Sequence, residues 1–172
     1  MEKFYIGVLQ GCSQMGGVVI RRLIKHFGSG RQVWQAEKGE LEQVGILRTS
    51  VLEEFLAVRN QRPDWPLELA EVCQQRHIEL VTRDGDDYPA LLKEIANPPE
   101  ILFYRGHLQN HLPRIAMVGA RKVSAYGRTV AHQLGDSMAK AGFSVVSGAA
   151  VGVDTCSHEG AMKKGATEAV LG

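Results

Sequence analysis

Apolar residues recur at helical spacing through the first part of the chain. Three segments, 18–29, 40–61 and 67–78, repeat an apolar residue every three or four positions, and glycines interrupt the pattern. In the first segment one helical face is apolar and the other is basic, with Val18, Val19, Leu23 and Phe27 opposite Arg21, Arg22 and Lys25. Gly28 is suited to end this helix. The pattern predicts an α-helical domain over residues 1–77.

Two glycines, Gly16 and Gly17, precede the basic helix and predict a tight turn. A glycine turn that leads into a basic helix is typical of helix-hairpin-helix modules, which hold a DNA phosphate with backbone N–H groups. A small helical bundle with a basic face turned to solvent has the same pattern and is the commoner structure. Both interpretations remain open at this point.

The pattern changes to short strands and turns after residue 77. It predicts, in order, a strand at 78–82, a turn at 84–89, a short helix at 90–95, a strand at 101–106 and a surface loop at 107–113. Pro98 and Pro99 force an extended entry into the second of these strands. We therefore place a domain boundary after residue 77 and a second domain over residues 78–172.

Strands and helices alternate after Pro113. An apolar segment that ends near a glycine, 114–120, is followed by a helical segment, 126–142, and by a second apolar segment, 143–148. A strand, a helix and a strand within about 35 residues form a βαβ unit. Because both strands are apolar throughout, we expect a parallel sheet that is covered on both faces.

A further helix and strand follow. Residues 154–165 predict a helix with Asp154 as its N-cap and Gly165 as its stop, and residues 167–172 predict a third strand. The fold class is therefore α/β, with an N-terminal α-helical domain followed by a Rossmann-like parallel sheet. Because a doubly wound sheet normally has more than three strands, we expect this sheet to be truncated and residues 1–172 to be part of a longer protein.

Composition narrows the classes of function. The 20 lysines and arginines balance 19 aspartates and glutamates, so a polyanion has to be held by a local patch. The three cysteines, Cys12, Cys73 and Cys156, are far apart and accompany no histidine cluster, which argues against a disulfide framework and a metal site. No signal segment and no apolar run of about 18 residues is present, so we expect a cytoplasmic protein.

The carboxyl ends of the predicted parallel strands carry the candidate chemistry, because ligands of open α/β sheets bind there. After the first strand, Gly119 permits a close approach of backbone to an anion, and Arg121 offers a planar set of donors suited to phosphate. Ser124 is a candidate N-cap or phosphate contact. After the second strand, Ser147, Gly148 and Gly152 lead to the helix at Asp154, so that backbone N–H groups again face an anion.

Other interpretations of these residues stay open. The turns match neither the dinucleotide fingerprint nor the P-loop, and glycines at strand ends also serve simply to make tight turns. Asp154 and His158 lie one helical turn apart, which suits an acid–base pair but equally a helix cap and a packing histidine. Tyr126 and Phe143 can stack on bases, although aromatic residues beside such strands usually belong to the core.

Four segments of the chain together resemble the DNA-processing protein A family (DprA, also called Smf): the glycine-punctuated N-terminal helices and residues 87–106, 118–127 and 147–167. The resemblance implies a SAM-like or helix-hairpin-helix-like N-terminal domain and an extended Rossmann-like domain that binds single-stranded DNA. It also implies protection of DNA taken up in natural transformation, delivery to the RecA recombinase and a homodimer of the full-length protein. Neither a cofactor nor an established catalytic activity comes with it.

The resemblance also carries residue roles. It makes Arg121 the DNA-contacting arginine of a motif that Ser124, Tyr126 and Gly127 complete. It assigns the glycine-rich turn to Ser147, Gly148 and Gly152, and the aspartate and histidine of the second motif to Asp154 and His158. Ala120 departs from the family pattern, which has threonine or serine there, so a hydroxyl donor to phosphate is missing.

Our hypothesis from the sequence is a protein that binds single-stranded DNA through its phosphates, without preference for sequence and with strong salt dependence. The alternative is a Rossmann-like enzyme that binds or cleaves nucleotides, with Asp154 and His158 as acid and base. A third possibility is that residues 1–172 bind neither ligand.

Overall fold

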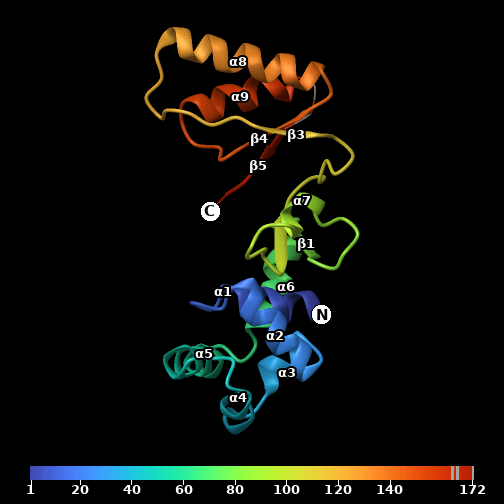
Figure 1. The fold of residues 1–172 in the computed structure, drawn as a ribbon, viewed down its shortest axis with the longest axis vertical. Helices are drawn as coiled ribbons and strands as arrows, with labels where there is room; N and C mark the ends of the chain where they lie inside the picture. The colour runs from blue at the N-terminus through green and yellow to red at the C-terminus, as the bar shows by residue number, and fades with distance from the viewer. Residues whose placement is uncertain (164, 166, 172) are drawn as a thin grey trace. The chain divides into compact units, whose positions relative to one another are not determined.

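The computed structural model describes residues 1–163, 165 and 167–171, which form two compact units, Met1–His107 and Leu108–Gly172. The first unit contains α1 (Glu2–Gly11), α2 (Gly17–Phe27), α3 (Gly30–Gln35), α4 (Lys38–Val44), α5 (Thr49–Gln61), α6 (Trp65–Gln75), β1 (Glu79–Thr82), α7 (Ala90–Lys93) and β2 (Ile101–Tyr104) (Figure 1). The second unit contains β3 (Arg114–Ala116), α8 (Ala125–Lys140), β4 (Ser144–Ser147), α9 (Val153–Met162) and β5 (Thr167–Ala169).

The first unit is a helical assembly around α1. Val8 and Leu9 of α1 are fully buried together with Ile20 of α2 and Phe55 of α5. The helical N-terminal region is thus confirmed, although α1 and α3 lie outside the three segments that the sequence predicted. The predicted segment 40–61 is two helices, because Gly45 adopts the left-handed conformation, with φ of 64°, and ends α4.

A two-stranded antiparallel sheet, β1 with β2, packs on these helices. The side-chain amide of Gln10 in α1 bonds both the N–H and the carbonyl of Ile101, at 3.1 and 2.9 Å, and Lys3 donates to the carbonyl of Leu80 at 3.1 Å. These contacts explain why the compact division of the chain falls after His107, whereas the sequence placed a boundary after residue 77. That residues 78–172 form one extended domain stays a prediction.

The start of α2 is covered by the segment that precedes β2. A Cβ atom on Gly17 would lie 2.1 Å from the carbonyl oxygen of Pro98, and the N–H of Val18 donates to Oδ1 of Asn97 at 3.3 Å. Gly16 has extended backbone with φ of −72°, so the predicted tight turn is not what explains the two glycines. They are needed because the segment before β2 packs closely against them. Because Asn97 and Pro98 already cover the N-terminus of α2, the structure gives no support to a phosphate contact there.

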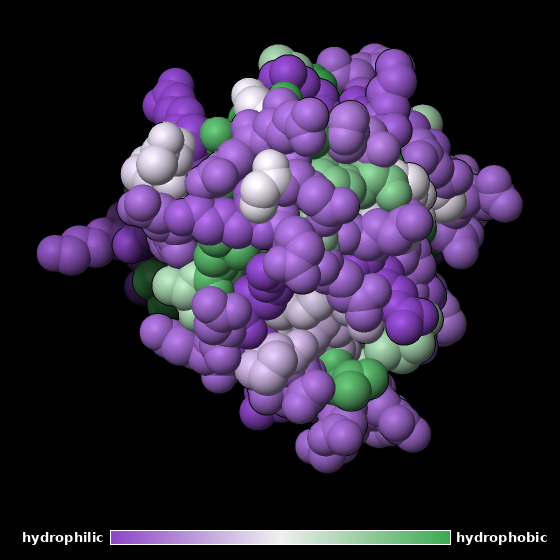
Figure 2. Space-filling model, turned by 90° about the horizontal axis from the view of Figure 1, so that it is seen from below, coloured by the Kyte–Doolittle hydropathy of each residue, from purple (hydrophilic) through white to green (hydrophobic). Residues whose placement is uncertain are grey.

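The basic face of α2 also differs from the expectation. Arg21 pairs with Glu100, a carboxylate that is only 7% exposed, instead of lying free in water. Arg22 and Lys25 are exposed as predicted, whereas Val18 is exposed and does not join the apolar face. Gly28 adopts φ of 94° and ends the helix as predicted. Figure 2 looks onto the side of the first unit that carries α3 to α5, where most of the surface is hydrophilic.

The second unit is a three-stranded parallel sheet in the order β3-β4-β5. Both connecting helices lie on one side of it, as Figure 1 shows, with Val145 buried against Ala139 of α8 and Ala161 of α9. The Rossmann-like fold class is confirmed, but coverage of both faces is wrong for the helices described in this unit. When sequential strands are neighbours, right-handed crossovers place both helices on the same face.

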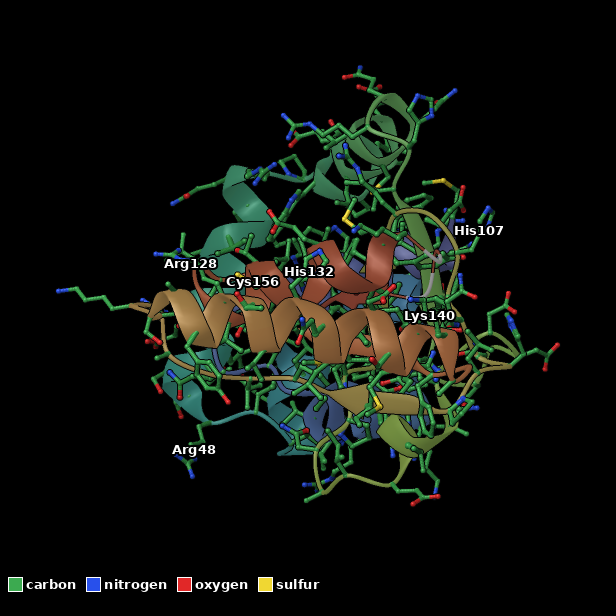
Figure 3. All side chains as sticks on the ribbon, turned by 90° about the horizontal axis from the view of Figure 1, so that it is seen from above. Arg48, His107, Arg128, His132, Lys140 and Cys156 are labelled. Atoms are coloured by element: carbon green, nitrogen blue, oxygen red, sulfur yellow. The ribbon has the colours of Figure 1, made fainter. Side chains whose placement is uncertain are left out.

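The two helices of the second unit touch through their backbones (Figure 3). A Cβ atom on Gly135 of α8 would lie 2.3 Å from the carbonyl oxygen of Ser157, and one on Gly160 of α9 would lie 2.1 Å from that of His132. Glycine at both positions allows this approach, since no other residue lacks a Cβ atom.

The last predicted strand is partly outside the described residues. β5 ends at Ala169, and Gly172, the predicted end of the strand, is not among them, nor is residue 164 of the predicted helix 154–165. Gly165 has φ of 74°, the left-handed conformation that its predicted role as helix stop requires. In the described part of the chain, no helix is both long and apolar enough to cross a membrane.

Candidate nucleic-acid interface

The two predicted turns, residues 117–124 after β3 and residues 147–152 after β4, lie against each other. We call them the first turn and the second turn. The N–H of Val153 donates to the carbonyl of Ala120 at 3.2 Å. A Cβ atom on Gly152 would lie 2.3 Å from that same oxygen, and one on Gly119 would lie 2.7 Å from Cγ2 of Val153. The glycines therefore let the two turns meet at the carboxyl ends of the strands.

Gly152 is required for a second reason, since its φ of 100° is one that side chains rarely permit. Gly119 does not adopt a positive φ. Glycine is required at this position because any Cβ atom would collide with the side chain of Val153. In the second turn Ala149 also has a positive φ, of 54°. Non-glycine residues in this conformation are uncommon and often occur at functional sites.

Ser147 links the two turns through a buried hydrogen bond. Its hydroxyl is buried and donates to the carbonyl of Met117 at 2.6 Å, beside the backbone bond from Met117 to Val146 at 2.9 Å. A hydroxyl used in this way is not directed at a ligand. Thr155 adds a further bond, from its hydroxyl to the carbonyl of Ala150 at 2.7 Å, which holds the second turn to the start of α9.

Ser124 and its neighbours shape the end of the first turn. The Ser124 hydroxyl accepts a hydrogen bond from the N–H of Gly127 at 3.1 Å, so its interpretation as the N-cap of α8 is confirmed. A Cβ atom on Gly127 would lie 2.7 Å from Cγ2 of Val123. Tyr126 is 79% exposed, so the expectation that an aromatic residue here belongs to the core is wrong for this residue.

Asp154 lies inside the first turn of α9 and is not its N-cap, which is Gly152. The predicted cap is wrong because Val153 already has helical backbone. The side chain is 7% exposed, and Oδ2 lies 3.2 Å from the position that a Cβ atom on Gly148 would take. A carboxylate in the first turn of a helix stabilises it through the helix dipole, but it also repels an anion at the same place.

His158 points away from the turns. Nδ1 lies 2.6 Å from Oγ1 of Thr167 in β5, and this hydroxyl donates to the carbonyl of Val145 at 2.9 Å. Because the threonine proton is used, Nδ1 carries the hydrogen and donates. Nε2 is buried without a hydrogen-bond partner among the described residues. Asp154 and His158 share a helical face but form no hydrogen bond to each other in the described structure.

Three basic side chains surround the first turn and its helix. Arg121 and Lys122 are exposed on the turn, and Arg128 is exposed near the start of α8, where Figure 3 labels it. None of them forms an ion pair with another residue in the described part of the chain. The sequence singled out Arg121 alone, although Lys122 follows it directly and Arg128 lies one helical turn after Ser124.

Positive charge is concentrated in the second unit. It has seven lysines and arginines against four aspartates and glutamates, a net charge of +3, whereas the first unit has thirteen against fifteen, a net charge of −2. This distribution favours the second unit as the part of a near-neutral chain that attracts a polyanion. Among the described residues, no three histidine, cysteine, aspartate or glutamate side chains come together to hold a metal ion.

The family model described as DNA recombination-mediator protein A matches residues 79–172, from β1 through the whole second unit. The chain belongs to this family. The resemblance seen in the sequence is thereby confirmed, and the match takes in the first and second turns together.

Individual relatives agree with this assignment. Protein Smf of Synechocystis is 33% identical over 164 residues, which cover 92% of this chain and 41% of that protein. DNA processing protein DprA of Bacillus subtilis is 31% identical over 147 residues, covering 80% of this chain and 49% of that protein. The X-ray structure of DprA from Streptococcus pneumoniae matches with a TM-score of 0.70 and 25% identity, over 98% of this chain and 57% of that one. The chain thus spans about half the length of these relatives.

Proposed function

We propose that this chain binds single-stranded DNA through its phosphates, at the paired turns of the second unit. The observation that carries the proposal is the contact between the two turns at the strand ends, with Arg121 and Lys122 exposed beside it. Membership of a DNA recombination-mediator family favours DNA over a mononucleotide as the polyanion.

The residues at the turns divide by the role that we assign to them. Arg121 contacts phosphate directly as a planar donor, Lys122 and Arg128 add charge, and Gly148, which is exposed in the second turn, offers its backbone N–H. Six of the remaining predicted residues shape the turns or the helix starts that follow them: Gly119, Ser124, Gly127, Ser147, Gly152 and Asp154. His158 instead joins α9 to β5 through Thr167. Tyr126, exposed in the first turn of α8, is assigned to contact with a base.

Phosphate contacts carry no information about sequence. We therefore expect similar affinity for oligonucleotides of different sequence, and affinity that falls steeply with salt because bound counterions are released. The family resemblance supports three further proposals for the complete relatives: protection of incoming DNA, delivery of that DNA to RecA and a homodimer. This chain spans about half of such a protein, so they are not expected of it by itself.

The nucleotide-cleaving alternative needs Asp154 and His158 to act together on a substrate. The hydrogen bond from His158 to Thr167 directs the imidazole towards β5 and away from the two turns, which counts against this alternative. Calorimetry with nucleoside monophosphates separates the two functions. Saturable binding with turnover that His158→Ala abolishes would favour the enzyme.

Fluorescence anisotropy with labelled oligonucleotides tests the proposal. We expect Arg121→Ala to weaken binding roughly tenfold, as the loss of a charge-assisted hydrogen bond does. It should also reduce the slope of log K against log salt by about 0.7, the contribution of one phosphate on a single strand. Arg48→Ala is the matched control, since Arg48 is an exposed arginine of the first unit. Unchanged affinity and slope for Arg121→Ala would contradict the assignment of this residue.

A further inference from the structure

A second concentration of positive charge lies in the first unit, although the net charge of that unit is −2. Residues 3–36 contain five lysines and arginines and no aspartate or glutamate. Residues 37–107 contain eight lysines and arginines against fourteen aspartates and glutamates, and Glu2 is the remaining acidic residue. The net charge of the first unit therefore masks a basic segment, which includes α2 and α3, and an acidic remainder.

Four exposed basic residues of this segment lie together, and we call them the α2–α3 basic surface: Arg22, Lys25, His26 and Arg31. The first three follow each other in α2 at spacings of three and four residues, so they are neighbours on the helix surface. The chain then leads from α2 into α3 (Figure 1). A Cβ atom on Gly28 would lie 2.6 Å from Oε1 of Gln32, so the first turn of α3, which includes Arg31, lies against the end of α2.

The α2–α3 basic surface is not neutralised by the described part of the chain. Arg22, Lys25 and Arg31 form no ion pair with another described residue, and α2 contains no acidic residue. In α4 and α8, by contrast, a lysine pairs with an acidic residue four positions away. The carboxylate of Glu2 accepts hydrogen bonds from the backbone N–H groups of Gly30 and Arg31. The charge of the surface is thus available to a partner.

Helix stability explains only part of this arrangement. Lys25 and His26 lie in the last turn of α2, where the helix dipole favours cations. Arg22 lies one turn earlier, and Arg31 lies in the first turn of α3, where the dipole disfavours a cation. The two arginines therefore do not serve the helices that carry them, and their positions favour a role in binding.

The composition of the surface indicates the class of partner. Protein–protein interfaces have an apolar core that is depleted in lysine. Among the described residues of α2 and α3, Val18 is the only large apolar residue that is exposed, and it lies in the first turn of α2. A surface with several cations and without an apolar centre fits the phosphates of a nucleic acid, which arginine and lysine contact without reading the bases.

We propose that the α2–α3 basic surface binds the phosphate backbone of duplex DNA. This site goes beyond the proposed function, because it belongs to the first unit and needs no contact at Arg121. Duplex DNA carries one negative charge per about 1.7 Å of its axis, twice the density of a single strand. Since neither helix exposes a phenylalanine, tyrosine or tryptophan among the described residues, the surface gains nothing from the unstacked bases of a single strand. The duplex is therefore the form that it binds more tightly.

Fluorescence anisotropy of the 172-residue chain with a labelled duplex tests the inference. The variant that combines Arg22→Gln with Arg31→Gln should bind the duplex about 5- to 30-fold more weakly, as the loss of two exposed ion pairs does. It should also reduce the slope of log K against log salt by about 1.8, which is about 0.9 for each of two phosphates. Circular dichroism checks that the variant is folded.

The matched control combines Arg48→Gln with Arg76→Gln. It removes the same charge from exposed positions of the first unit that lie outside the basic segment. We expect it to leave the slope unchanged and to change duplex affinity less than about twofold, because exposed charges farther than a Debye length from the DNA are screened. Equal losses in the two double variants would mean that only the total charge matters, and they would overturn the inference. So would an unchanged affinity and slope in the first variant.

Two further comparisons separate the alternatives. Polyglutamate that displaces the duplex as well as unlabelled duplex of equal charge does would make the surface a site for acidic polypeptides and would refute the inference. Arg121→Ala should weaken binding of a single-stranded oligonucleotide and change duplex affinity less than about twofold. A chain that binds single strands but no duplex refutes the inference and leaves the proposed function intact. Duplex binding that depends on Arg22 and Arg31, with single-strand binding that ignores Arg121→Ala, supports the inference and counts against the proposed function.

Discussion

The close contact between α8 and α9 predicts how much stability the substitution Gly160→Ala should cost. Alanine is a better helix former than glycine by about 1 kcal/mol, so the substitution alone should stabilise α9. The added Cβ atom, however, would lie 2.1 Å from the carbonyl oxygen of His132, whereas real Cβ atoms do not come closer than 3.0 Å. The backbones of the two helices must therefore separate by about 0.9 Å, the difference between these distances.

Overpacking of this kind costs about 1–3 kcal/mol, and here the cost falls in the upper part of the range because a backbone carbonyl cannot rotate aside. Subtracting the helix-propensity gain leaves a net loss of about 1–2 kcal/mol. For a unit of this size we expect the melting temperature to fall by about 4–16 °C. Thermal unfolding followed by circular dichroism and calorimetry measures the shift.

Gly39→Ala is the matched control, because Gly39 lies in helix α4 and nothing is within 4 Å of the position that its Cβ atom would take. It gains helix propensity without a clash, so we expect it to raise stability by about 0.5–1 kcal/mol. A Gly160→Ala protein that melts at or above the temperature of the unsubstituted chain would refute the argument from close packing.

Two further predictions concern the first unit. Burial raises the pKa of Cys12 from 9.0 to about 11, so this thiol stabilises the fold fully below pH 9, and that contribution is lost as the pH rises through 11. The stability advantage of the unsubstituted chain over Cys12→Ala in urea unfolding should shrink by about 2 kcal/mol between pH 8 and pH 11, and a constant difference would contradict it. Glu100→Gln removes the charge that the buried carboxylate offers to the half-exposed Arg21 and should cost about 1–2 kcal/mol. Glu68→Gln, in an ion pair exposed on both sides, should cost less than about 0.5 kcal/mol, and equal losses would contradict the role of burial.

Much of the candidate site was predictable because strand ends, helix caps and tight turns depend on a few neighbouring residues. Ser124 caps α8, and Gly28 ends α2, as the local pattern indicated. The strand ends pointed to Arg121 and to the glycine-rich turn, and the family resemblance added their expected role in DNA contact. Both groups were predicted at the ends of adjacent parallel strands, and this is where the structure has them.

Exposure and the direction of side chains needed the tertiary structure. An aromatic residue beside such a strand usually belongs to the core, but Tyr126 is 79% exposed. The helical periodicity places Asp154 and His158 on one face, but it does not specify that Thr167, from the next strand, accepts the hydrogen bond of the imidazole. Lys122 and Arg128 can be identified in the sequence, but only the structure shows that neither forms an ion pair with another described residue.

The sequence by itself determined the order of helices and strands after residue 77, the α/β class and the two glycine turns, because each depends on interactions within a few residues or on motifs that the family shares. Only the tertiary structure decided what those residues touch. It showed that Gly17 is needed for contact with Pro98, that Gly119 and Gly152 join two turns, and that both helices of the second unit cover one face of the sheet. These are contacts between segments distant in sequence, and local patterns carry no information about which distant segment will meet them.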